Sequence, residues 1–183
     1  MAMNPAARNH LIEQLKAHTM KREYIAFVEG RSGTLKGTWR QWLQLSRDEL
    51  HQEILSATNA QAPGAEAREA ITHFEVVDEY PLADGKGFVS KLRFRLETGR
   101  KHQIRVQAAN AGLPLVGDRT YNPAIRNPGS DRARTCIDFP RQALHAEVLS
   151  LEHPARPGMR MTWKAELPKD LRQLETALRS GRL

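Results

Sequence analysis

Alternating apolar and basic positions give the clearest structural prediction in this chain. Between residues 89 and 96, every second position from Leu92 to Leu96 is apolar, and the intervening positions are arginine. This period of two is typical of a half-buried strand. The segment 22–29 is rich in β-forming residues and carries apolar groups on both faces, which is typical of a central strand. We expect further strands over 34–43, 70–77, 143–149 and 159–164, with 34–43 returning beside 22–29 as a hairpin.

Helical spacing and capping residues predict three helices. The first begins at Asn4, as N-cap, and Pro5, with an apolar face of Ala7, Leu11 and Leu15, and ends near Thr19. A second follows the strand over 89–96, with Thr98 or Gly99 near its N-cap and Gly112 just past its end. The last opens at Pro168 and carries Leu171, Leu174 and Leu178. The capping-box spacing of Ser46 and Glu49 adds a short helix or turn.

These elements predict an α+β fold with a largely antiparallel sheet and flanking helices. We expect a single domain over residues 1–183, with flexible loops over 56–68 and 122–135. The second loop contains Arg126, Arg132 and Arg134, so it is either a mobile basic loop or a solvated insertion without a ligand.

The charge balance favours a polyanionic partner. Lysine and arginine number 28 against 21 acidic residues, giving a formal charge of +7, so we expect nucleic acid or an anionic surface, or else a basic protein with no such partner. The single cysteine, Cys136, excludes an internal disulfide and a zinc cluster, and it fits a reducing cytoplasm. We expect no membrane span and no signal peptide, because no apolar run approaches the length of either.

Four cationic or titratable groups gather where the second helix begins: Arg100, Lys101, His102 and Arg105. Cations are unfavourable at a helix N-terminus, whereas an anion is favourable there. Two readings are open: a phosphate or carboxylate site, or a solvated basic turn in which Arg100 or Arg105 bonds an internal carboxylate. Tyr24 on the predicted central strand can likewise stack on a base or move a proton, or simply be an interior aromatic.

Other common sites lack support. Phosphate-loop, dinucleotide-binding and nucleophile-elbow motifs do not occur, and the seven histidines are scattered, so we expect no metal.

Three blocks in order resemble the RluA-type RNA pseudouridine synthases. The segments 96–105 (L-E-T-G-R-K-H-Q-I-R) and 112–118 (G-L-P-L-V-G-D), with Tyr121, resemble the third motif block of that family. The segment 21–30 is similar to its K-x-Y-x-A-x-V-x-G segment, and 143–146 with His153-Pro154 is similar to its C-terminal signature.

The resemblance implies an isomerase that converts uridine in RNA, ribosomal RNA in particular, to pseudouridine without a cofactor. It implies a mixed sheet with a central cleft that receives a flipped base. Tyr24 would stack on the base and help remove its C5 proton, Arg105 would hold the catalytic aspartate, and Leu144 would line the base pocket. From their charge, we expect Arg100, Lys101 and the basic loop over 122–135 to face RNA phosphate, and His102 to bind substrate with them. We take the protein to be a monomer in the cytoplasm.

One departure affects the predicted activity. The aspartate of the family lies in a segment resembling H-R-L-D-x-x-T-S-G, and this sequence has none. We therefore expect a catalytic domain truncated at its N-terminus, with Arg105 lacking its carboxylate and the first helix lacking its neighbour. The chain alone should make no pseudouridine. The alternatives are a non-catalytic RNA-binding remnant, half of a split enzyme, and a product that does not fold stably.

Overall fold

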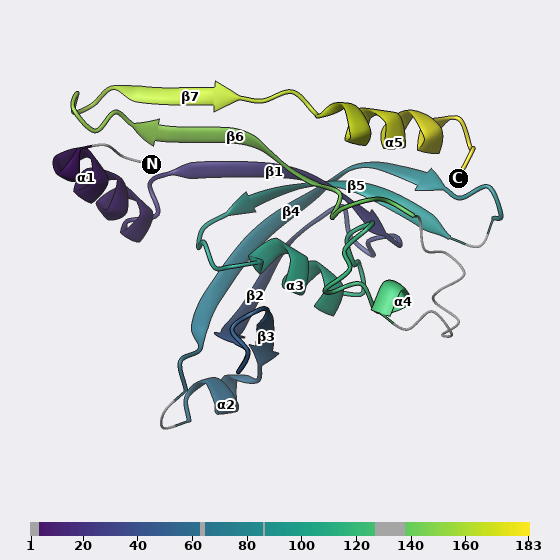
Figure 1. The fold of residues 1–183 in the computed structure, drawn as a ribbon, viewed down its shortest axis with the longest axis horizontal. Helices are drawn as coiled ribbons and strands as arrows, with labels where there is room; N and C mark the ends of the chain where they lie inside the picture. The colour runs from purple at the N-terminus through teal and green to yellow at the C-terminus, as the bar shows by residue number, and fades with distance from the viewer. Residues whose placement is uncertain (1–3, 63–64, 86, 127–137) are drawn as a thin grey trace.

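A computed structural model describes residues 4–62, 65–85, 87–126 and 138–183. Seven strands form one sheet in the order β3-β2-β4-β5-β1-β6-β7, and every pairing among the described residues is antiparallel (Figure 1). The strands are β1 Lys21–Glu29, β2 Lys36–Leu45, β3 Gln52–Leu55, β4 Arg68–Pro81, β5 Phe88–Leu96, β6 Leu144–Glu152 and β7 Arg160–Lys164. The helices are α1 Pro5–Lys16, α2 Ala57–Ala60, α3 Gln103–Asn110, α4 Pro123–Arg126 and α5 Lys169–Arg179. The predicted α+β class is confirmed.

Strand β1 is central, as its apolar faces predict. It pairs with β5 on one side and with β6 on the other. Successive residues alternate between faces: Phe27 packs against the leucines of α5, whereas Ala26 and Val28 pack against α3. The sheet therefore has a hydrophobic core on each face, with α5 covering one and α3 the other (Figure 1).

The predicted hairpin between β1 and β2 is wrong. Strand β2 forms as expected, but it pairs with β3 and β4. Both edges of β1 are already occupied, so β2 can join the sheet only farther out. Gly37 permits its close approach to β4, because a Cβ atom there would lie 2.5 Å from the ring of Phe74.

The capping-box segment forms a turn rather than a helix. Ser46 Oγ donates to Asp48 Oδ1 and lies within hydrogen-bonding distance of the backbone of His51, and β3 follows directly. The predicted loop over 56–68 contains the one-turn helix α2, N-capped by Ser56, and β4 begins at its last residue. Residues 63–64 and 127–137, the latter with Arg132 and Arg134, lie outside the described residues, so the flexibility of both loops stays a prediction.

Helix α1 is anchored by a polar side chain. Asn4 caps it as predicted, accepting from the amide of Ala6 at 2.8 Å, but it ends at Lys16. The predicted apolar face is right only in part: Ala7 and Leu11 are half-buried, but Leu15 is 43% exposed and the buried residue is Gln14. Gln14 Oε1 accepts from the amide of Glu152 at 2.7 Å, and its Nε2 donates to the carbonyl of Glu152 at 2.8 Å. The expectation that this helix has no neighbour is therefore also wrong, since it docks on the end of β6.

Candidate active site

Tyr24 and Leu144 lie on the sheet face that α3 covers. Tyr24 is half-buried on β1, opposite Phe94 of β5 and Ala146 of β6. Leu144 lies opposite Ala26 on the next strand. Both side chains pack against the hydrophobic core that includes Ile104 of α3, the helix that carries Arg105. The sheet thus brings these predicted site residues to one face.

Arg105 is paired with Asp118. Its Nε donates to Oδ2 at 2.7 Å and its Nη2 donates to Oδ1 at 2.8 Å, the side-on fork typical of an arginine–carboxylate pair. The Arg105 side chain is 12% exposed and that of Asp118 is fully buried. The expectation that Arg105 lacks a carboxylate is wrong, and for Arg105 the reading of an internal carboxylate partner is confirmed.

This pair is ionised at neutral pH. Burial alone raises the pKa of Asp118, but the hydrogen bonds and charge of Arg105, with backbone amides of Thr120 and Tyr121, bring the pKa below its ordinary value. Hydrogen bonding to Asp118 in turn raises the pKa of Arg105. The two charges therefore cancel within the protein.

Tyr121 links this pair to β3. The Arg105 guanidinium lies 5.0 Å from the centre of the Tyr121 ring, an arrangement that favours a cation–π contact. The Tyr121 hydroxyl accepts from the amide of Gln52 at 2.7 Å and lies 3.1 Å from His102 Nδ1. Sequence reasoning missed the roles of Asp118, Tyr121 and Gln52. The G-D-x-x-Y spacing contained the signal for the first two.

The start of α3 differs from the prediction. His102 occupies the N-cap position in a left-handed conformation, with φ of 53° and no side-chain cap. The Thr98 hydroxyl is used elsewhere, because it accepts from the amide of Ile71 at 2.8 Å and donates to Gln103 Oε1 at 3.0 Å. Burial, followed by the charges of Arg105 and Lys101, lowers the pKa of His102, so this ring is neutral at pH 7.

The remaining cations reach backbone carbonyls. Arg100 Nε donates to the carbonyl of Glu69 at 3.1 Å, and Lys101 Nζ donates to that of Glu49 at 2.7 Å. Both side chains line a cavity of about 310 Å³ beside Gly99. Neither Arg105 nor Asp118 lines this cavity.

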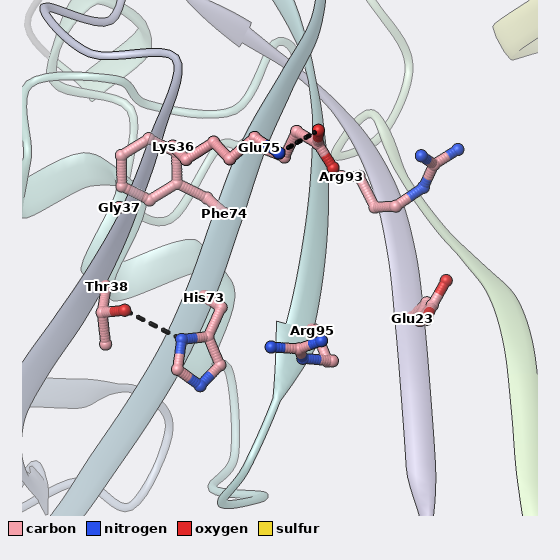
Figure 2. Close-up of a pocket in the computed structure, with 9 residues that line it drawn as sticks. All are labelled: Glu23, Lys36, Gly37, Thr38, His73, Phe74, Glu75, Arg93 and Arg95. Carbon is pink, nitrogen blue, oxygen red and sulfur yellow. Dashed lines mark hydrogen bonds and ion pairs between the residues drawn. The ribbon is translucent and has the colours of Figure 1, made fainter.

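A larger cavity, of about 610 Å³, lies on the other side of the sheet (Figure 2). His73 and Glu75 line it, and they flank Phe74, whose side chain packs on the α3 side. Its polar groups are partly paired, with Lys36 Nζ 3.0 Å from Glu75 Oε1 and the Thr38 hydroxyl 2.8 Å from His73 Nδ1. None of the sequence-predicted site residues lines this cavity.

The described residues contain neither a metal-binding cluster nor a membrane-spanning helix. The described part of the chain contains no group of three or more histidine, cysteine or acidic residues that could hold a metal ion. Within the same residues, every helix is too short or too polar to cross a membrane.

Known proteins match this chain along nearly its whole length. It is 34% identical over 182 residues to ribosomal large subunit pseudouridine synthase D of Pseudomonas aeruginosa, covering 96% of this chain and 51% of that protein. It is 35% identical over 181 residues to the uncharacterized RNA pseudouridine synthase YlyB of Bacillus subtilis, covering 99% of this chain and 52% of that protein. The chain thus spans about half the length of these curated relatives.

The fold also matches a solved structure. Human RNA pseudouridylate synthase domain containing 1 superposes with a TM-score of 0.66 at 24% identity, covering 98% of this chain and 74% of the human one. A family model described as RNA pseudouridylate synthase matches residues 1–110, which include β1 with Tyr24 and α3 with Arg105. By this match and by its similarity to the bacterial synthases, the chain belongs to the RNA pseudouridylate synthase family and is of the RluA type.

Proposed function

We propose that this chain acts in the isomerisation of uridine to pseudouridine in RNA. The observation that carries the proposal is the position of Tyr24, half-buried on the central strand of a family member, on the same sheet face as Leu144 and the helix of Arg105. In this reaction the N1–C1′ bond of uridine breaks, a C5–C1′ bond forms, N1 gains a proton and C5 loses one. The atoms balance without a cofactor.

Each predicted site residue has a role in this proposal. The ring of Tyr24 would stack on the uracil base, and its hydroxyl would help to remove the C5 proton. Leu144 would line the base pocket beside it. Arg100, Lys101 and His102 would contact the RNA, the first two as cations and His102 as a neutral hydrogen-bonding group.

Arg105 would hold the catalytic carboxylate through its free donors. Asp118 uses Nε and Nη2, and Nη1 has no hydrogen-bond partner among the described residues. A guanidinium has five N–H donors, so Asp118 fixes the plane of Arg105 while other donors remain for a second acceptor.

The proposed substrate is ribosomal RNA. Relatives at 34% identity are named ribosomal large subunit pseudouridine synthases, and the formal charge of +7 suits a polyanion. A ribosomal substrate also implies that the chain acts in the cytoplasm.

A second candidate function is RNA binding without catalysis, either alone or as half of a split enzyme. Two observations favour it. The 183 residues contain no segment like H-R-L-D-x-x-T-S-G, and the carboxylate that does pair with Arg105 is buried and fully hydrogen-bonded. Asp118 is therefore a poor nucleophile.

The test is to incubate the purified chain with unmodified ribosomal RNA and to map pseudouridine at nucleotide resolution. We expect salt-dependent RNA binding and no pseudouridine from this chain alone. Adding a separately produced N-terminal half of a curated relative, with its aspartate, should restore product, and Tyr24→Phe should reduce it. Product from the chain alone would exclude the non-catalytic reading. Failure of both RNA binding and complementation would overturn the proposed function.

A further inference from the structure

Three cations surround one cavity next to α3. The cavity, of about 310 Å³, lies where the end of β2, the starts of β3 and β4, and the turn before α3 meet. Arg68 enters it from β4, and Arg100 and Lys101 enter it from the turn. Glu66 is the one acidic residue that lines it. The charged side chains that line the cavity are therefore mainly positive.

These cations are uncompensated. Within the described residues, none of Arg68, Arg100 and Lys101 forms an ion pair with a carboxylate. Other cations of the fold do: Arg105 pairs with Asp118, and Lys36 pairs with Glu75. Positive charge that the protein leaves unpaired at a concave site favours an anionic ligand.

Two of the three cations are oriented by the backbone. Arg100 Nε donates to the carbonyl of Glu69, and Lys101 Nζ donates to that of Glu49. A carbonyl fixes the direction of a side chain without cancelling its charge. Each contact also uses a single donor, so the other N–H groups of the guanidinium and ammonium remain available.

The two arginines disfavour each other. Burial lowers the pKa of Arg100, and the nearby charge of Arg68 lowers it further. An anion placed between the two guanidinium groups offsets their repulsion. It also takes the place of hydration that burial has already reduced.

We propose that this cavity, lined by Arg68, Arg100 and Lys101, binds a phosphodiester group of RNA. The inference rests on the proposed function, which supplies the RNA strand, and it adds Arg68 to the residues that contact it. Phosphate suits the site because guanidinium groups bind its oxygens through paired hydrogen bonds. The volume of the cavity is at the lower end of that of small-molecule sites, enough for a phosphate group.

The first experiment measures binding of a fluorescently labelled single-stranded RNA to the full chain. Arg68→Gln and Arg100→Gln should each weaken binding about three- to tenfold at low salt and flatten the dependence of log K on log salt by about 0.7. Arg68→Lys, which keeps the charge, should retain part of the affinity. The matched control is Arg8→Gln on α1, which removes the same charge from an exposed residue that does not line the cavity and should change affinity less than twofold. If Arg8→Gln and Arg68→Gln lose RNA affinity equally, the inference about this cavity is overturned. The proposal that the chain binds RNA would still stand.

The second experiment separates RNA from free phosphate. Inorganic phosphate is titrated into the ¹⁵N-labelled chain, and the amide shifts of Gly99, Arg100 and Lys101 are followed. We expect saturable shifts in the wild type that Arg68→Gln abolishes, together with the loss in RNA affinity. If phosphate shifts these amides but the chain binds no RNA, the cavity is an anion site whose ligand is not RNA. That result would also overturn the proposed function. No shift and no loss of RNA affinity in Arg68→Gln would overturn the site itself.

Discussion

Arg105 and Asp118, thirteen residues apart, face each other through two parallel hydrogen bonds of 2.7 and 2.8 Å. The contact joins α3 to the turn that follows it. Because both charges come from this chain, the orientation of Arg105 does not depend on any other carboxylate.

Asp118→Asn should destabilise the chain strongly. Asparagine keeps the volume but removes the charge, which leaves the guanidinium of Arg105 buried without its counter-ion. Removing one partner of a buried pair reduces the free energy of unfolding by about 3–5 kcal/mol. Urea denaturation followed by circular dichroism measures this loss. In a double-mutant cycle with Arg105→Met, the double variant should lose less than the sum of the single losses, and additive losses would argue against the pair.

The stabilisation by Asp118 should depend on pH. Its pKa is lowered in the folded state, so the stabilisation is present above the unfolded pKa, about 3.9, and is lost as pH falls through the lower folded pKa. The stability difference between wild type and Asp118→Asn should therefore be constant above about pH 5 and shrink toward pH 2. Denaturation midpoints of both proteins across this range provide the measurement, and the variant serves as the control for every other carboxylate. A difference that does not change with pH would contradict the assigned shift.

Gly117→Ala should destabilise the protein far more than Gly112→Ala. Both glycines have positive φ, 72° and 76°. A Cβ atom at Gly117 would lie 2.2 Å from the carbonyl oxygen of Arg141 and 2.7 Å from that of Phe139, whereas nothing lies within 4 Å at Gly112. We expect about 1–2 kcal/mol of destabilisation for Gly112→Ala, the conformational term alone, and a much larger loss for Gly117→Ala. Thermal unfolding of both variants separates the cost of a positive φ, which both share, from the steric clash at residue 117. Equal losses of stability in the two variants would show that the structure relieves this clash at no cost.

Gln14→Glu should release α1 without unfolding the sheet. The carboxylate retains an acceptor but cannot donate to the carbonyl of Glu152, which Gln14 Nε2 now contacts at 2.8 Å. Amide hydrogen exchange in α1 should accelerate, while exchange in β1 stays slow. Glu13→Ala is the control, because among the residues that the structure describes the Glu13 side chain pairs with exposed Lys16 alone, and such pairs contribute little. Unchanged protection of α1 in Gln14→Glu would mean that other contacts hold the helix.

Local patterns predicted the elements of this fold well. The alternation over Leu92–Leu96 gave β5, the two apolar faces of 22–29 gave the central strand, and the leucines after Pro168 gave α5. In each case burial of one segment follows from its own residue spacing. The pairing of β2 could not be derived in this way, because it depends on which strand edges remain open once β1 lies between β5 and β6.

The candidate site was predicted in part. The sequence located the cationic turn before α3, but it placed the N-cap at Thr98 or Gly99, whereas His102 occupies that position. Tertiary contacts decide this, because the hydroxyl of Thr98 is committed to Ile71 and Gln103. The role of Tyr24 stays a prediction. It also left Arg105 without a partner. The carboxylate of Asp118 reaches Arg105 only because the chain reverses after α3, at Gly112 and again at Gly117.

The position of β1 in the sheet has a consequence for synthesis of the protein. Its partners begin at Phe88 and Leu144, so the apolar residues Ile25–Val28 are made long before the strands that bury them. At roughly 5–20 residues per second, the second partner follows on the order of ten seconds later. Both edges of β1 are unpaired until β5 is made, and the second edge stays open until β6 follows, so burial of the central strand depends on residues synthesised far along the chain.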